Sequence, residues 1–202
     1  MTTQNTNDSP EQLAEVLKNL EHVDWPAIWA GPPSPGQALN DWCALFSWEP
    51  LPDERSLGVR TPTGQRLTLY PRAGQIWAPV RVLATTFWHL RAGDASENAE
   101  VLARAADVWP AYEAAARSVL GEPEYSGAWD DPAFPEPPHE RHWLWPRDLR
   151  LQHQNPYRLA MWHPKGPEDR VTVLKVNLGV AASARSPRAA LIDLDCYPPE
   201  DW

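Results

Sequence analysis

The residues best suited to chemistry stand in one stretch rich in proline and tryptophan, GAWDDPAFPEPPHERHWLWP, at 127–146. It contains the adjacent carboxylates Asp130 and Asp131, a further acid at Glu136, and the histidines His139 and His142. Metal binding, acid and base hydrolysis, and recognition of a partner each make a different demand on such residues. We therefore compare the spacing of these residues with what each of the three kinds of site requires.

Two histidines three positions apart could share a metal ion with His153, His163 or Asp131. A zinc-protease helix, however, places its histidines four apart, with a glutamate directly after the first. Here two prolines precede His139 and strand-like residues follow His142. On a strand, an offset of three points the two rings to opposite faces. We therefore expect solvated or hydrogen-bonded histidines, with no metal ligands and no cofactor.

Asp130 and Asp131, with Glu136 nearby, could act as the acid and base of a glycosidase-like reaction. Neighbouring carboxylates in a loop are more typical of a turn or a helix cap, and no second acidic pair stands at an evident strand end. The chain has no glycine-rich phosphate loop, no G-x-S-x-G motif and no CxxC pair. We assign no catalytic residues, and a small hydrolase with a dispersed acidic site is the second alternative.

Arginines alternate with aromatic residues beyond this stretch. Arg147, Arg150 and Arg158 could bind phosphates, and rings such as Trp143 and Tyr157 could stack on bases, as on a surface for single-stranded nucleic acid. The competing interpretation is a solvated outer sheet face with the rings toward the core. An overall pI near 5.1 opposes binding to free nucleic acid. An anion-binding or nucleic-acid-binding sheet face is therefore the first alternative.

Length and composition indicate one soluble domain. With 202 residues, 43% of them apolar, the chain can bury a substantial core. It has no apolar stretch of the roughly 18 residues that a membrane helix needs, and its polar start is not a signal peptide. We expect a cytoplasmic protein without a membrane partner. Cys43 and Cys196 are expected to be free thiols.

Three helices are expected. Ser9-Pro10-Glu11-Gln12 is a capping box that predicts a helix over about 10–21. A second helix follows the breaker AGPPSPG and ends before Pro50. A third opens at Asp94 and ends at Gly121, with Pro110 kinking it or marking a junction.

Alternating apolar residues predict the strands. Together these segments predict an α+β domain, with helices packed on a mainly antiparallel twisted sheet in the order α-α-β-β-β-α-β-β-β-β. Residues 1–8 are expected to be disordered, and 9–202 to form a single domain with a long Pro/Trp-rich loop at 122–141. The expected strands lie at 57–59, 67–69, 76–90, 143–145, 149–153, 157–163 and 171–178, and 189–194 could form a last strand.

Charge alternates by segment along the chain, whose net charge is -9. Residues 1–54, 92–140 and 189–202 are acidic, whereas 55–91 and 141–188 are basic. The basic blocks coincide with expected strands and the acidic blocks with helices and loops. We therefore expect a basic outer sheet face and an acidic helical side.

Three features resemble a family of small actinobacterial proteins of immunity type from polymorphic toxin systems. They are Val119-Leu120-Gly121-Glu122-Pro123 at a helix end, Trp143 entering paired strands, and Trp48 after a helix; the resemblance spans about 37–178. It implies a fold similar to secretion-chaperone-like α+β domains that act by binding another protein.

From this resemblance we expect a protein that neutralises a cognate toxin by occlusion, not an enzyme. An acidic surface with tryptophan anchors suits a basic partner such as a nuclease. The expected partner-binding residues are Trp129, Asp130, Asp131, Glu136 and Trp143.

Overall fold

The computed structural model describes residues 3–51, 57–72, 78–139, 142–163, 166, 169–179 and 186–201. The chain divides into two compact units, each described here by itself. The first unit comprises Met1–Leu17, Thr86–Trp162 and Val173–Leu194, and the second comprises Lys18–Thr85, His163–Thr172 and Asp195–Trp202. A few elements, such as strand β5 (Val80–Arg91), contribute residues to both units.

The sheet of the first unit contains strands from distant parts of the sequence. Its strands follow the order β5, β9, β8, β7, β6, and β1 also pairs with β5. The β1–β5 and β6–β7 pairings are antiparallel. The bounds are β1 (Thr3–Asn7), β6 (Tyr125–Ala128), β7 (Arg158–Trp162), β8 (Val171–Leu178) and β9 (Ala189–Tyr197).

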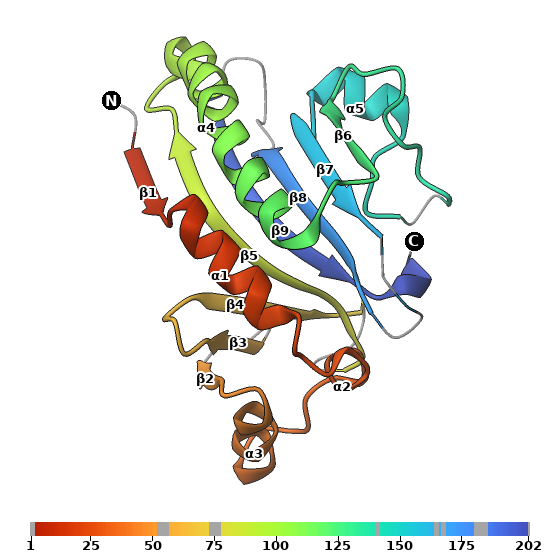
Figure 1. Cartoon of the computed structure of the whole chain (residues 1–202). Coiled ribbons are helices and arrows are strands. Elements are labelled where there is room, and N and C mark those ends of the chain that lie inside the picture. The colour runs from red at the N-terminus through yellow and green to blue at the C-terminus, as the bar shows by residue number, and fades with distance from the viewer. Residues whose placement is uncertain are drawn as a thin grey trace. The chain divides into compact units, whose positions relative to one another are not determined.

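Helix α4 (Asn98–Leu120) covers one face of this sheet (Figure 1). Its buried residues, Val101, Ala105, Trp109, Tyr112 and Ala116, recur every three or four positions and form one stripe toward the strands. The apolar side of an amphipathic helix thus packs on the sheet and excludes water from both.

Capping residues mark the ends of the helices of this unit. Ser9 and Gln12 form the reciprocal capping box at the start of α1 (Pro10–Leu20). Asp94 caps the 3-10 turn η1 (Ala95–Glu97), which leads into α4, and Gly121 ends α4 with φ 84°. A positive φ is available to glycine without strain, which explains this C-terminal stop.

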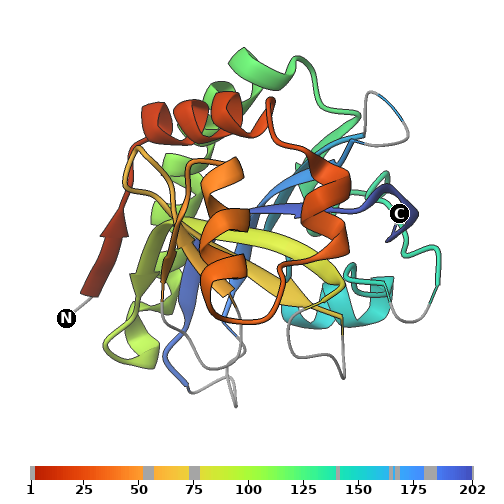
Figure 2. The ribbon, with the colours of Figure 1, turned by 90° about the horizontal axis from the view of Figure 1, so that it is seen from below.

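The second unit contains a short antiparallel meander. Strands β2 (Glu49–Leu51), β3 (Leu57–Arg60) and β4 (Arg66–Pro71) pair in sequence, and β4 pairs with β5 through Leu69 opposite Leu83. Helices α2 (Trp25–Ala30) and α3 (Gln37–Leu45) precede the meander (Figure 2). The 3-10 turn η2 (Pro199–Asp201) follows β9.

The fold class expected from the sequence is confirmed: helices pack with a mainly antiparallel sheet, and the element order is broadly as predicted. The long third helix runs without interruption past Pro110. Within the described residues, no helix is long and apolar enough to cross a membrane.

Two predicted strands are wrong. Residues 143–145 are irregular, and 149–153 belong to the helix α5 (Arg147–His153) in the first unit. Pro146 at the N-cap, Asp148 in the first turn and Gln154 in a left-handed C-cap are helix signals that the alternation of Leu149 and Leu151 obscured. In so short a segment, alternating apolar residues are compatible with either a strand or a helix.

The predicted loop and N-terminus also differ from the structure. The segment 122–141 contains strand β6, so the irregular connection is shorter than expected. Thr3–Asn7 form strand β1, although 1–8 were expected to be disordered. Residues 76 and 77, the first two of the predicted strand at 76–90, lie outside the described residues.

Candidate functional site

The proline-rich loop begins at the edge of the sheet of the first unit. Strand β6 stands last in the strand order and pairs with β7 through Gly127 opposite Leu159 and Ala128 opposite Arg158. The N–H of Trp129 donates to the carbonyl of Tyr157 at 3.4 Å, one step beyond the strand. The sheet therefore sets where the loop starts and in which direction it leaves.

Asp131 organises the first turn of the loop. Its Oδ1 accepts a hydrogen bond from the N–H of Ala133 at 2.8 Å, and its own N–H donates to the carbonyl of Ala128 at 3.1 Å. The N–H of Phe134 then donates to the carbonyl of Asp131 at 3.1 Å. An aspartate that bonds the backbone two residues on is a standard turn-forming device. Asp131 thus has a structural part in shaping the loop.

Arg150 joins the two ends of the loop. Arg150 is only 2% exposed, and its Nη1 donates a hydrogen bond to the carbonyl of Trp129. Its Nη2 lies 3.2 Å from Glu136 Oε1, and its Cζ lies 4.0 Å from the centroid of the Phe134 ring. One guanidinium therefore ties the start, middle and end of the segment 129–136. A charge-assisted bond to a main-chain carbonyl is stronger than a neutral one, so this clamp restricts the loop to one conformation.

Tyr125 and Gly127 support the loop from β6. The Tyr125 ring packs edge-on against Phe134, with centroids 5.4 Å apart. Burial and the nearby charge of Asp131 raise the pKa of the Tyr125 hydroxyl well above its ordinary value. A Cβ at Gly127 would lie 2.2 Å from the Tyr125 hydroxyl and 2.6 Å from Asp131 Oδ2. Only glycine leaves room for this arrangement.

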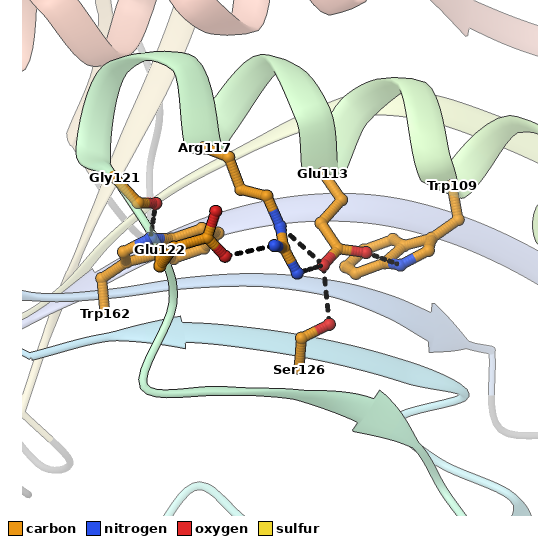
Figure 3. A network of polar contacts seen from close by, with 7 residues as sticks. All are labelled: Trp109, Glu113, Arg117, Gly121, Glu122, Ser126 and Trp162. Atoms are coloured by element: carbon orange, nitrogen blue, oxygen red, sulfur yellow. Dashed lines mark hydrogen bonds and ion pairs between the residues drawn. The ribbon is translucent and has the colours of Figure 1, made fainter.

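A second network holds β6 to the C-terminal part of α4 (Figure 3). Glu113 Oε1 accepts from Ser126 Oγ at 2.7 Å and from Arg117 Nη2 at 2.7 Å, and its Oε2 accepts from Trp109 Nε1 at 2.8 Å. Arg117 also pairs with Glu122. Burial alone would raise the pKa of Glu113, but the bonds from Ser126, Arg117 and Trp109 lower it below its ordinary value. The spacing of Trp109, Glu113 and Arg117 at four-residue intervals was the sequence signal for this network, and it was missed.

The clamp leaves a distinct set of side chains exposed. Asp130 is exposed, the Glu136 side chain is 55% exposed, and Trp129 is half-buried. On α5 the usual pattern is reversed, because Arg150 is buried while Leu149 and Leu151 are 42% and 39% exposed. We call the set Trp129, Asp130, Glu136, Leu149 and Leu151 the loop–α5 surface. Exposed acids thus lie on the loop and exposed leucines on α5, and Arg150 contacts the loop backbone from α5.

Four of the predicted partner-binding residues belong to this loop, and the fifth lies elsewhere. Trp129, Asp130, Asp131 and Glu136 fall within eight residues of one clamped segment. The Trp143 ring instead stacks near His142, at 5.1 Å between centroids, and lies 5.4 Å from Lys175 Nζ of β8.

The histidines of the stretch lie close to each other. The rings of His139 and His142 have centroids 5.5 Å apart and stand nearly perpendicular. Among the side chains that the structure describes, no group of three or more His, Cys, Asp or Glu is placed to hold a metal ion.

The three arginines of the anion-binding alternative do not share a strand. Arg147 and Arg150 lie on α5, and the guanidinium of Arg150 is already engaged by Trp129 and Glu136. Arg158 lies on β7, with its Cζ 5.9 Å from the centroid of the Tyr157 ring. Residue type identified Arg150 as a candidate site residue, but its contacts indicate a clamp.

Comparisons with known proteins identify no relative: no family model, no curated protein and no solved structure matches this chain. The residues of the loop–α5 surface are therefore the basis for assigning a function to this chain.

Proposed function

We propose that this chain binds another protein through the loop–α5 surface. The observation that supports this most directly is the buried Arg150 clamp, which holds an acidic loop in one conformation. A binding segment that is ordered in advance loses less conformational entropy when its partner arrives. A loop with no binding role would have less need of a buried cation, whose removal from water is costly.

The exposed side chains specify the partner's chemistry. Asp130 and Glu136 favour a basic surface and would speed its approach by electrostatic attraction. Leu149 and Leu151, exposed on either side of Arg150 along α5, offer apolar contacts. Aromatic anchors surrounded by polar contacts account for much of the affinity in protein interfaces, and Trp129 is the aromatic residue of this surface.

The resemblance to immunity proteins suggests what such binding achieves. We propose that the partner is a cognate toxin with a basic site, such as a nuclease, and that this chain neutralises it by occluding that site. The acidic residues of the loop support this role, because they would meet cations that otherwise bind nucleic acid.

A pull-down from the lysate of the organism that encodes this chain tests the proposal. We expect one stoichiometric protein, released at high salt, whose purified form binds the chain and whose toxicity is relieved by co-expression. Recovery of nucleic acid alone would favour the anion-binding alternative, and an absence of any bound macromolecule would contradict the proposal.

Point variants then locate the surface on the purified complex. Asp130→Asn and Leu149→Glu should each weaken binding by about tenfold, the scale of an interface anchor. Asp107→Asn is the matched control, because Asp107 is an exposed acid on α4 of the same unit. Equal affinity of all three variants would remove the site assignment while leaving the partner in place.

A further inference from the structure

Helix α3 in the second unit carries apolar residues on its exposed side as well as on its buried side. Leu39 and Cys43, one turn apart, are buried. Trp42 and Leu45, three positions apart and therefore neighbours on the helix surface, are half-buried and 75% exposed respectively. Leu45 is thus a large apolar side chain that the second unit leaves largely in contact with water.

The residues beside Leu45 form an ordered aromatic cluster. The Phe46 ring lies 4.9 Å from both the Trp42 and the Trp48 rings, measured between centroids, and Trp48 is buried. The N–H of Phe46 donates to the carbonyl of Cys43 at 3.1 Å, and Ser47 then takes a positive φ of 58°. The exposed Leu45 therefore lies next to a packed aromatic cluster.

The neighbouring strand limits how a partner could dock here. β2 follows α3 and stands first in the strand order, so one of its sides is an edge. Pro50, in the middle of β2, has no N–H to donate to an added strand. Strand addition is thus opposed. A helix that presents anchors at i, i+3 and i+4 is instead suited to a partner's groove, and Trp42 and Leu45 of α3, with the C-cap residue Phe46, have this spacing.

We propose that this α3 face, formed by Trp42, Leu45 and Phe46, is a second docking surface, and that its occupant is a protein with an apolar groove rimmed by Lys or Arg. The charges beside the face support this choice. Asp41 and Glu49 are both exposed, and Glu49 makes a surface ion pair with Arg60 at 3.7 Å. Such exposed pairs contribute little, so the acids can still attract cations.

A second copy of this chain is the less suitable occupant. Each copy has a net charge of -9 and would bring the same Asp41 and Glu49 to the contact. Like charges placed together at an interface oppose association. This proposal does not depend on the loop–α5 surface, because it rests on other residues.

Site-specific photocrosslinking tests the α3 face. The photoreactive amino acid p-benzoylphenylalanine replaces Leu45 in one full-length variant and Ala44 in the control; Ala44 is exposed, but lies about 100° further around the helix. After irradiation in the host lysate, we expect an adduct from position 45 and little from position 44. The crosslinked partner is identified, purified and titrated against the chain.

The affinities then decide the proposal. Leu45→Glu should weaken binding of the purified partner by about tenfold, whereas Ala44→Glu should change it by less than about twofold. Circular dichroism should confirm that both variants are folded. The proposal is overturned by no adduct at 45, by equal adducts at 44 and 45, by equal affinities, or by a crosslinked surface without an apolar groove and basic rim. A wild-type dimer in sedimentation that Leu45→Glu dissociates would also overturn it, by assigning the face to a second copy.

Discussion

Arg150 Nη1 donates a hydrogen bond to the carbonyl of Trp129, 21 positions earlier in the chain. The same guanidinium reaches Glu136, 14 positions away, so one buried side chain of α5 sets the shape of the loop that precedes it. Three measurements test this arrangement and the network that supports it, and a fourth tests the burial of the two cysteines.

Replacing Arg150 should destabilise the first unit. In Arg150→Leu the Trp129 carbonyl loses its charged donor, and an unsatisfied polar group in a buried setting costs about 1–3 kcal/mol. We expect that loss in urea unfolding, together with faster amide hydrogen exchange in 129–136. Arg147→Leu, at an exposed position of the same helix, should change stability by less than about 0.5 kcal/mol. Equal effects of the two variants would contradict the clamp.

Gly127→Ala should disturb the loop at its start, where the chain leaves β6. Its Cβ would press on the Tyr125 hydroxyl and the Asp131 carboxylate, so one of them has to move. Overpacking of this kind costs about 1–3 kcal/mol, measurable as a lower midpoint of thermal unfolding. Gly166→Ala is the control, since nothing lies within 4 Å of its added Cβ. An unchanged midpoint for Gly127→Ala would mean that the close contact relaxes freely.

Glu113 should make part of the stability depend on pH. Its folded-state pKa lies below the ordinary value of 4.5, so the carboxylate stabilises the folded state above that pH. This contribution is lost as the pH falls from 4.5 through the folded-state pKa. The difference in unfolding free energy between the wild type and Glu113→Gln should therefore be largest near neutral pH and shrink toward pH 3. A difference that stays constant over this range would show that the Glu113 charge is not what stabilises the network.

The two cysteines should be unreactive in the folded protein. Both are buried free thiols, and burial raises the pKa of each to about 11. Since the thiolate is the nucleophile, we expect no labelling by a thiol reagent at pH 7.5 until urea unfolds the chain. Rapid labelling of the native protein would show that at least one cysteine is more accessible than its burial indicates.

Local signals accounted for the elements that depend on neighbouring residues. The capping box at Ser9 and the long helix ending at Gly121 follow from side chains within one turn of each end. Helix α2 was missed although it has such a signal: Asp24 accepts the N–H of Ala27, and Pro26 stands in the first turn. Its six residues are too few to establish a period.

The candidate site was predicted only in part. Residue types drew attention to Trp129, Asp130, Asp131 and Glu136, and they also drew attention to Arg150, but as an anion-binding residue. Nothing local shows that a guanidinium on α5 reaches a carbonyl 21 positions away. The Glu113 network had a local signal only in part, because Trp109, Glu113 and Arg117 stand four positions apart on α4 whereas Ser126 lies on β6.

The sequence by itself determined the α+β class, the main helices and the strands β3, β4 and β5, because caps, turns and apolar periodicity act between residues close along the chain. Only the tertiary structure decided that Arg150 faces inward while Leu149 and Leu151 are exposed, and that this arginine contacts both ends of the acidic loop. The physical reason is that burial of a side chain and the partner of a buried charge depend on segments brought together by folding, and neither is written in the local pattern.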